Sequence, residues 1–307
     1  MKVAEIKVIK ARRELLNKAK LRRNDFFNDH LILVKDAEIK TDYDFLNVIQ
    51  AEQYIKKLST DNNITQIPFN FVDGKLEKNR ENLLTTLIDN ENVLWKTAVE
   101  FREIERELLH FTELFFWNQY RIAVSGLTYR FYPTTDEGMH FDTFKKGRPG
   151  LFKPGTRAFK VFFNVDKEDR IWRVGPTLQE FCLNMKDDLP DELPTDVNSF
   201  CYVVDKLGLL DGVNVQEVAI PPGGMMIANG TMAAHQVVYG NRMVCLEAAI
   251  KAMDGVPTVP TEQDSYRSIV RKLGLRTTDA FADLEEFHAL DGSYERAKKR
   301  LENSGAA

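Results

Sequence analysis

The sequence predicts an α+β fold in which a strand-rich core lies between a helical region and a helical tail. Short segments rich in Val, Ile, Phe and Tyr, separated by Gly, Pro and Asn, occupy residues 119–252, a pattern typical of an antiparallel sandwich or barrel. Apolar residues at helical spacing precede this core and return after the Pro-rich segment "GVPTVPTEQD". We therefore expect a mainly helical region over residues 1–118, packed on the core, and a helical tail over residues 253–307.

The first 23 residues are predicted to form a basic helix. They are rich in Lys and Arg, and roughly helical spacing relates Val3, Ile6, Ile9, Leu15 and Leu16. We expect one face of this helix to pack on the protein, although a basic amphipathic helix is also able to lie on an anionic membrane. The segment contains acidic residues and no Ser, which argues against a transit peptide.

Residues 81–120 carry the clearest helical pattern. A spacing of three to four places these apolar residues on one face: Val99, Phe101, Ile104, Leu108, Phe111 and Phe115. We interpret this stripe as a surface that faces the core, and the neighbouring His110 as a structural residue.

The core is predicted to contain several short strands. They are "RIAVSG", "LTYRFY", "RAFKVFFNV", "RIWRV", "QEVAI", "MMIAN" and "RMVCLEAAI". The Pro-containing and acidic segment at about residues 178–212 interrupts them and is predicted to be a helical or loop insertion, a kind of segment that often carries function.

The tail is predicted to contain further helices, in "SYRSIVRKLGL", "DAFADLEEFHAL" and "SYERAKKRLENSG". Thr261 or Asp264 is expected to cap the first of them. His288 lies beside Phe281 and Leu284 in the second helix, and we interpret it as a packing residue.

The composition argues against several classes of protein. A net charge of −4 and a pI near 5.9 give no overall electrostatic reason to bind nucleic acid. Cys182, Cys201 and Cys245 form no zinc-ribbon pattern, and they favour a reducing compartment over a disulfide framework. The sequence has no apolar run of the roughly 20 residues that cross a bilayer, and no signal-peptide h-region. We expect a soluble, cytoplasmic protein with a small-molecule partner and an oligomeric state that the sequence leaves open.

The tripeptide "HFD" places His140 and Asp142 two residues apart. Five histidines and 46 acidic residues in 307 positions predict roughly 0.75 such pairs by chance, so the surroundings must support a site. In an extended strand both side chains point to the same face and can bind one metal ion. His235 is the best third ligand, because it lies at the start of a predicted strand after the Asn229-Gly230 turn.

Two imidazoles and one carboxylate form the facial triad of non-haem Fe(II) oxygenases, which leaves three positions for a bidentate 2-oxo acid and O2. Zinc also accepts two His and one Asp, so ligand type alone leaves a zinc hydrolase open. The distal carboxylate of 2-oxoglutarate needs a cation, and a guanidinium binds it through two parallel hydrogen bonds. Arg157 is the first candidate, and Arg130 and Arg242 are the others.

Substrate-binding residues are expected beside this site. A Gly-containing cationic segment is able either to close over an anionic substrate or to remain a solvated loop; its charges are Lys145, Lys146, Arg148 and Lys153. Trp172 and Arg173 are further candidates for the pocket, although packing is the commoner role of such a tryptophan.

The sequence also resembles a known family. The segments "HFDTF", "TRAFKVFFNVD", "RIWRVG", "IPPGGMMIANGTMAAHQV" and "CLEAAI" are similar to those of Fe(II)/2-oxoglutarate-dependent oxygenases, and within them to the Kdo hydroxylases that modify a lipopolysaccharide sugar. The resemblance covers roughly residues 120–250. It implies a double-stranded β-helix, a jelly-roll or cupin-like barrel, with His140, Asp142 and His235 as metal ligands.

The resemblance further implies Fe(II), 2-oxoglutarate and O2, with ascorbate in support, and it puts Arg130 and Arg157 where the family has arginines that hold 2-oxoglutarate. Because halogenating relatives have a small residue in place of Asp142, its presence favours hydroxylation, desaturation or ring closure. The segment between Arg130 and Asp142 is shorter than the family's loop, which predicts a changed substrate.

We therefore expect an enzyme that oxidises an unactivated C–H bond of a small carboxylated biosynthetic metabolite, by hydroxylation or by oxidative ring closure like that of kainoid synthases. A Kdo hydroxylase is the alternative within the family. A non-catalytic, cupin-like binding protein is the alternative from another class, since a barrel by itself does not fix function.

Overall fold

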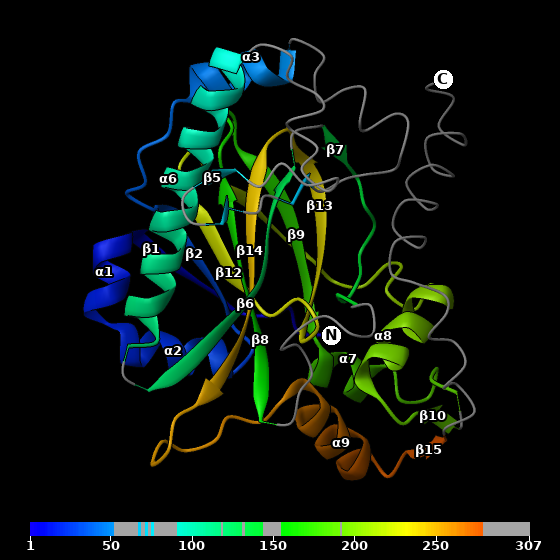
Figure 1. The fold of residues 1–307 in the computed structure, drawn as a ribbon. Helices are drawn as coiled ribbons and strands as arrows, with labels where there is room; N and C mark the ends of the chain where they lie inside the picture. Colours follow the sequence, from blue (N-terminus) through cyan, green and yellow to red (C-terminus); the bar gives the residue numbers. More distant parts are fainter. Residues whose placement is uncertain are drawn as a thin grey trace, which may run out of the picture.

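The computed structural model describes residues 1–51, 67–68, 71–72, 75–76, 91–117, 119–130, 133–143, 155–190 and 192–278. Within them the chain forms two main β-sheets with helices around them (Figure 1). The order of the large sheet is β1-β2-β12-β8-β14-β6-β3, and that of the small sheet is β11-β9-β13-β7. This is a mixed α/β architecture.

The strands of the large sheet are β1 (Ile6–Ala11), β2 (Leu31–Asp36), β12 (Met225–Ala228), β8 (Thr156–Asn164), β14 (Met243–Ala252), β6 (Tyr120–Arg130) and β3 (Ile67–Pro68). Those of the small sheet are β11 (Gln216–Ile220), β9 (Arg170–Thr177), β13 (Ala233–Gly240) and β7 (Thr134–Thr135). Two further pairs are β10 (Glu192–Pro194) with β15 (Arg276–Thr278), and β4 (Phe71–Val72) with β5 (Lys75–Leu76).

The described helices are α1 (Arg12–Asn17), α2 (Ala19–Phe27), α3 (Tyr43–Ala51), α6 (Glu91–Phe115), α7 (Leu178–Asn184), α8 (Val197–Lys206) and α9 (Glu262–Leu273). The long helix α6 lies along the large sheet, whereas α7, α8 and α9 gather at one end of the molecule (Figure 1). The segment predicted as an insertion contains α7 and α8.

Core strands are distributed alternately over the two sheets. Along the chain, β6 and β8 join the large sheet while β7 and β9 join the small one; β11 and β13 then join the small sheet, and β12 and β14 the large one. The core pairings of β14 with β6 and β8, and of β13 with β7 and β9, are antiparallel. This interleaved order is that of a double-stranded β-helix.

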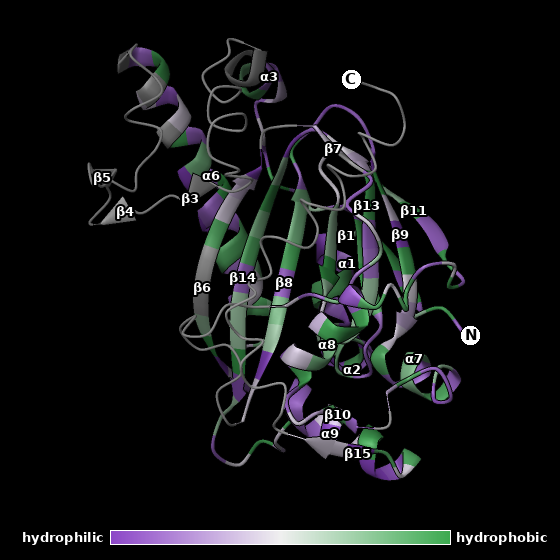
Figure 2. Cartoon of the chain, turned by 90° about the vertical axis from the view of Figure 1, so that its right-hand side faces the viewer, coloured by the Kyte–Doolittle hydropathy of each residue, from purple (hydrophilic) through white to green (hydrophobic). Residues whose placement is uncertain are grey.

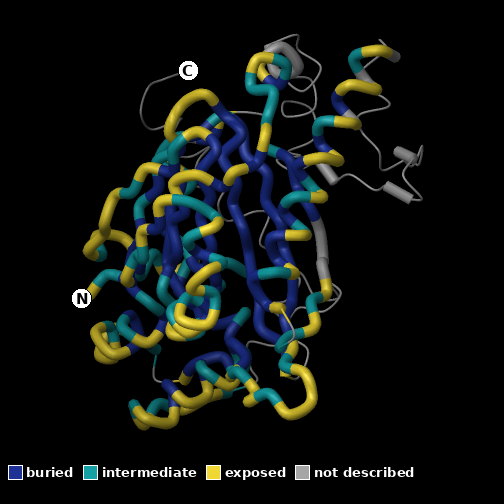
Figure 3. Tube along the Cα trace, turned by 90° about the vertical axis from the view of Figure 1, so that its left-hand side faces the viewer, coloured by how far each residue is buried: buried dark blue, intermediate teal, exposed yellow. Residues whose placement is uncertain are grey.

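The two sheets pack face to face. Phe162 and Cys245 of the large sheet share one buried apolar cluster with Trp172, Val174 and Val237 of the small sheet. Because side chains alternate along a strand, every second residue reaches this inner layer. Figure 3 shows these central strands as the main buried part of the trace.

The outer face of the large sheet is covered as well, so that β8 is buried along its whole length. Phe159, Val161 and Phe163 alternate with the inward residues of β8 and share a cluster with Phe101 and Phe111 of α6. Burying a side chain of this size contributes about 1.5–3 kcal/mol. Consistent with this, β8 and β14 are largely coloured as hydrophobic in Figure 2.

The N-terminal region differs from the predicted helix. Ile6–Ala11 forms strand β1, parallel to β2, and only then do α1 and α2 follow. β-Branched residues such as Ile6 and Val8 favour a strand when an edge is available for pairing, and β2 supplies that edge. The region of residues 1–118 therefore contributes strands to the same sheet as the core.

On α6 the predicted stripe is buried from Phe101 to Phe115, but Val99 is 43% exposed, so its assignment to the core was wrong. His110 is exposed on the same helix. In the tail, Thr261 caps α9 and forms a capping box with Asp264. The later tail helices, including His288, lie outside the described residues.

Among the described residues, no helix is both long enough and apolar enough to span a membrane. Cys182, Cys201 and Cys245 are free and buried.

Candidate metal centre

His140 and His235 are brought together by backbone pairing. His140 follows β7 in an irregular segment, and its N–H and C=O exchange hydrogen bonds of 3.0 Å each with those of His235 on β13. The two imidazole centroids lie 4.7 Å apart. The pairing therefore fixes the spacing of the side chains, although 95 positions separate the residues in the chain.

Each histidine is oriented by a hydrogen bond to its own loop or strand. Nδ1 of His140 lies 2.9 Å from the carbonyl oxygen of Gly138, and Nδ1 of His235 lies 3.2 Å from that of Ala233. A carbonyl only accepts, so in both residues Nδ1 carries the proton and Nε2 keeps a free lone pair. This is the tautomer that a metal ligand needs.

Asp142 completes the set with one of its two oxygens. Its Oδ1 lies 3.9 Å from Nε2 of His140 and 3.8 Å from Nε2 of His235. The ligand atoms of the three residues all lie within 4.8 Å of one another. The His-x-Asp spacing and the distal histidine thus meet at one point, as the sequence predicted.

Gly230 makes room for this carboxylate. A Cβ at residue 230 would lie 1.8 Å from Oδ2 of Asp142 and 2.7 Å from Cε1 of His235. The carbonyl of Gly230 accepts a 2.9 Å hydrogen bond from the N–H of Asp142, and the hydroxyl of Thr231 donates to the Asp142 carbonyl. Close approach to the ligands therefore requires glycine after Asn229.

A buried lysine lies beneath the carboxylate. Nζ of Lys160, on β8, is 2.9 Å from Oδ2 of Asp142 and 3.2 Å from Oε1 of Glu247 on β14. The two strands are in register at this point, with Lys160 opposite Glu247. The side chains of Lys160 and Glu247 are only 9% and 6% exposed.

These contacts set the protonation states. Burial raises the pKa of Asp142, but the charge of Lys160 and the two histidines outweigh it and hold the pKa well below its usual range. Burial lowers the pKa of His235 to about 4, with Asp142 opposing the shift. Burial also lowers the pKa of Lys160, yet Asp142 and Glu247 raise it above its ordinary value. At neutral pH the site therefore presents an anionic carboxylate and a neutral His235 imidazole.

Aromatic rings close one side of the centre. The indole of Trp172 stacks on the His235 ring at a centroid distance of 5.2 Å and an interplanar angle of 20°, and Phe162 meets Trp172 edge to face. Trp172 is therefore at the site, whereas the neighbouring Arg173 is directed to solvent with Glu217 as its ion-pair partner.

Arg130 lies close to the centre through Glu137. Its Nη1 is 3.0 Å from Oε1 of Glu137. Burial raises the pKa of Glu137, but the charges of Arg130, His140, Arg170 and His235 together lower it below its ordinary value. Glu137 is thus a carboxylate between cationic groups and the metal ligands.

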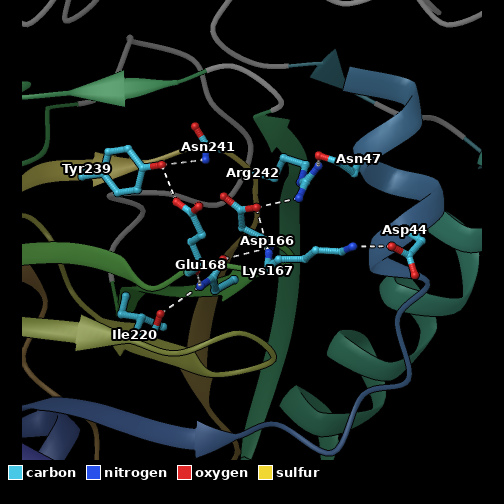
Figure 4. A network of polar contacts seen from close by, with 10 residues as sticks. Asp44, Asn47, Asp166, Lys167, Glu168, Ile220, Tyr239, Asn241 and Arg242 are labelled. Atoms are coloured by element: carbon cyan, nitrogen blue, oxygen red, sulfur yellow. Dashed lines mark hydrogen bonds and ion pairs between the residues drawn. The ribbon is translucent and has the colours of Figure 1, made fainter. Parts of the chain in front are cut away.

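The other two predicted arginines bind carboxylates of the protein. Arg157 forms an ion pair with Asp29 and donates a 2.8 Å hydrogen bond to the carbonyl of Pro260. Arg242 donates to Oδ1 of Asp166 at 2.5 Å and to Oδ1 of Asn47 at 2.9 Å (Figure 4). Both guanidiniums are buried in these contacts.

Several residues of the site lay outside the sequence predictions, namely Lys160, Glu247, Gly230, Glu137 and Arg170. A charged residue inside an apolar strand, as in "AFKVFF" and "CLEAAI", was the available signal for the first two. The predicted loop residues Lys145, Lys146, Arg148 and Lys153 lie outside the described part of the chain.

The donor set fits a divalent first-row metal ion. Two imidazoles and one carboxylate suit iron or zinc, and the fixed Nδ1 protons and the glycine beside Asp142 leave the ligand atoms converging. His140, Asp142 and His235 are the residues that would hold the ion.

Comparison with solved structures supports the fold. The chain is similar to the Kdo hydroxylase KdoO, described as a non-heme Fe(II) alphaketoglutarate-dependent dioxygenase, in complex with cobalt(II), with a TM-score of 0.58 and 14% identity over 80% of this chain and 89% of that one. Complexes of KdoO with succinate and Fe(III), and with alphaketoglutarate and Fe(III), give TM-scores of 0.56 and 0.54, at 14% identity, over 81% and 80% of this chain and 89% of each of theirs. The sequence matches no protein-family model and no curated protein.

Proposed function

We propose that the chain is an Fe(II)- and 2-oxoglutarate-dependent oxygenase. The observation that carries the proposal is the convergence of Nε2 of His140, Nε2 of His235 and Oδ1 of Asp142 inside a fold similar to that of a dioxygenase. A facial set of two imidazoles and one carboxylate leaves coordination positions for a 2-oxo acid and O2. The same geometry has no evident use in a protein that only binds a ligand.

When bound, Fe(II) with 2-oxoglutarate and O2 supplies the oxidising power that an unactivated C–H bond requires. The chain orients and shields this chemistry. The backbone carbonyls of Gly138 and Ala233 hold the two imidazoles in the Nε2-ligating tautomer. Trp172 and Phe162 exclude water from the inner side of His235.

For the distal carboxylate of 2-oxoglutarate we favour Arg130 among the three predicted arginines. It is paired with Glu137, whose carboxylate lies near both histidines, so an incoming dicarboxylate can replace one anion by another. Arg242 would have to leave Asp166, whose side chain is 6% exposed, buried without its ion-pair partner, which costs several kcal/mol. Arg157 lies on the face of β8 opposite to Lys160 and so points away from the metal ligands.

The proposed substrate is a small carboxylated metabolite that is hydroxylated or cyclised. The support is the short segment between Arg130 and Asp142, together with the cationic residues 145–153 of the sequence. A Kdo hydroxylase is not favoured, because a likeness of fold at 14% identity carries no information on substrate.

The first test is anaerobic addition of Fe(II) and 2-oxoglutarate to the purified protein. We expect the visible metal-to-ligand charge-transfer band of a chelated 2-oxo acid in the parent and in His110→Ala, a control that removes an exposed histidine of α6. His140→Ala should lack the band. If the parent shows no band while it binds zinc tightly, the oxygenase proposal is wrong and a zinc hydrolase replaces it.

The second test concerns the reaction. Carboxylated sugars and amino-acid derivatives are incubated with the Fe(II)-loaded protein, and products are identified by mass spectrometry. A gain of one oxygen indicates hydroxylation, and a loss of two hydrogens indicates ring closure or desaturation. Turnover of 2-oxoglutarate to succinate with Arg130→Met, measured beside Arg157→Met, tests which arginine holds the cosubstrate.

A further inference from the structure

The two oxygens of Asp142 have different neighbours. Oδ1 faces Nε2 of His235 at 3.8 Å and Nε2 of His140 at 3.9 Å, whereas Oδ2 lies 2.9 Å from Nζ of Lys160. One oxygen is therefore directed at the metal position and the other at a buried ammonium group. A carboxylate bound in this way has a single oxygen available as a ligand.

We propose that Lys160 is a positioning residue that keeps Asp142 a one-oxygen ligand, and so reserves three coordination positions for cosubstrates. This inference rests on the proposed metal centre. A carboxylate with both oxygens free is able to chelate a divalent ion, and the ion would then lose one of the positions that a bidentate 2-oxo acid and O2 need.

Glu247 offsets the repulsion between the Lys160 ammonium group and a bound metal ion. An ammonium group close to a bound cation is repelled by it, but Glu247 lies 3.2 Å from Nζ on the side of β14. The local set of Asp142, Lys160 and Glu247 carries one net negative charge. The attraction for a divalent cation is therefore retained while the lysine still holds Oδ2.

The strand geometry fixes the lysine in place. Lys160 and Phe162 lie on the inward face of β8, and the ammonium group is 6.0 Å from the centre of the Phe162 ring. Register pairs Lys160 with Glu247 on one side and with Ala228 of β12 on the other. Ala228 and Asn229 lead directly to Gly230, the residue whose missing Cβ makes room for Oδ2. Lysine and glycine thus confine the same oxygen from two directions.

A purely structural ion pair makes a different prediction from a positioning residue. If Lys160 serves only stability, its removal weakens folding and leaves the metal spectrum of the folded protein unchanged. If Lys160 restrains Asp142, its removal frees Oδ2, changes the ligand field and lowers the affinity for the 2-oxo acid, while affinity for the metal ion is kept or raised.

The test uses the double variant Lys160→Met/Glu247→Met, which removes both buried charges and so preserves the net charge of the centre. Co(II) is titrated into the full-length protein, the visible spectrum is recorded, and 2-oxoglutarate is then titrated into the Co(II)-loaded form. Lys251→Met, which removes an exposed lysine of β14, is the matched control.

We expect the double variant to bind Co(II) as tightly as the parent or up to tenfold more tightly, with shifted visible bands, and to bind 2-oxoglutarate at least tenfold more weakly. Lys160→Arg, which retains a cation beside Oδ2, should keep the parent spectrum. Lys251→Met should match the parent throughout.

Two outcomes would overturn the inference, and they are distinct. A double variant with the parent's Co(II) spectrum and 2-oxoglutarate affinity removes the role of Lys160 but leaves the proposed function intact. A parent protein that binds no Co(II), with His140→Ala behaving identically, removes the metal centre itself and the inference with it.

Discussion

Two buried polar clusters lie at opposite ends of β13. In one the polar atoms converge on a common point, and in the other they are bonded to each other. At one end His140, Asp142 and His235 turn their ligand atoms toward a common point. At the other end is the Asp166 cluster, defined as Asn47, Asn164, Asp166 and Arg242, in which the carboxylate receives the guanidinium at 2.5 Å. At about 3.3 Å per strand residue, the five steps from His235 to Gly240, the last residue of β13, span roughly 17 Å.

The difference shows what separates a candidate site from a structural cluster. In the Asp166 cluster the guanidinium of Arg242 neutralises the carboxylate. The amide oxygen of Asn47, on α3, accepts a hydrogen bond from Arg242, and the amide nitrogen of Asn164 donates to the carbonyl of Ile220 at the end of β11. In the metal centre the chain holds the outer nitrogens of the imidazoles and leaves the inner lone pairs available. Burial of charge alone is therefore a poor guide to function, whereas convergence of ligand atoms is a good one.

The largest expected effect comes from breaking the Asp166 cluster. Arg242→Met leaves Asp166 buried without its counter-charge, so the free energy of unfolding should fall by about 3–5 kcal/mol. Urea denaturation measures this fall. Because the cluster lies at the far end of β13, the folded variant should retain the parent's Co(II) affinity within about twofold. A large loss of that affinity would show that the two clusters are coupled.

The next effect concerns the metal centre. Gly230→Ala places a Cβ 1.8 Å from Oδ2 of Asp142, so the carboxylate must move and Co(II) affinity should fall about 100-fold, equivalent to about 2.7 kcal/mol. Gly230 has no positive φ, which leaves the clash as the cause. Gly224→Ala is the control, because Gly224 likewise has no positive φ and its added Cβ would meet Pro221 at 2.9 Å and none of the metal ligands; equal Co(II) affinity in both variants would contradict the geometry.

A third cluster lies between these extremes, because Asp29 there pairs with Arg157 but is also repelled by the charge of Glu262. Burial raises the pKa of Asp29 to about 6; Arg157 opposes this and the charge of Glu262 adds to it. The folded protein then holds more protons than the unfolded chain from about pH 4 to 6, so stability should fall as the pH rises through that window.

We expect this fall to be about 2 kcal/mol, somewhat less than the full pKa shift implies, because the Asp29 side chain keeps 19% of its exposure. The measurement is the unfolding free energy at pH 4 and pH 6.5. Asp29→Asn should show a correspondingly smaller change between the two values. An identical pH profile for the two proteins would mean that Asp29 is already ionised at pH 4.

The smallest expected effect concerns helix α9, whose first turn contacts the loop beside the metal centre. Thr261→Ala removes the N-cap and its capping box with Asp264, which should lower the unfolding free energy by about 1 kcal/mol. Thr258→Ala, at an exposed position before the helix, is the control. Glu262 accepts a hydrogen bond from Asn229 beside the metal loop, so a Co(II) affinity reduced more than twofold would extend the metal centre to α9.

The convergence of His140, Asp142 and His235 could be predicted because its signal is local. A His-x-Asp pair and a histidine at a strand start depend on residue type and strand alternation. Arg157 was chosen by the same logic, but alternation places it with Phe159 and Val161 on the outer face of β8, opposite to Lys160. The sequence shows the alternation without showing which face is inside.

The remaining features depend on contacts between distant segments. Lys160 meets Glu247 because β8 and β14 pair in one particular register. The first residues form β1 because β2 lies beside them, although their spacing also suits a helix. Propensity and spacing describe each segment by itself, and tertiary pairing decides between the alternatives.

The stacking of Trp172 on His235 has an optical consequence. Trp95 and Trp117 are 71% and 61% exposed, whereas Trp172 is 1% exposed and its ring centroid lies 5.2 Å from that of His235. We therefore expect its emission at shorter wavelength than that of the two solvated indoles. A paramagnetic ion held by His235 should quench this emission more than theirs, so Trp172 would be an intrinsic reporter of metal occupancy.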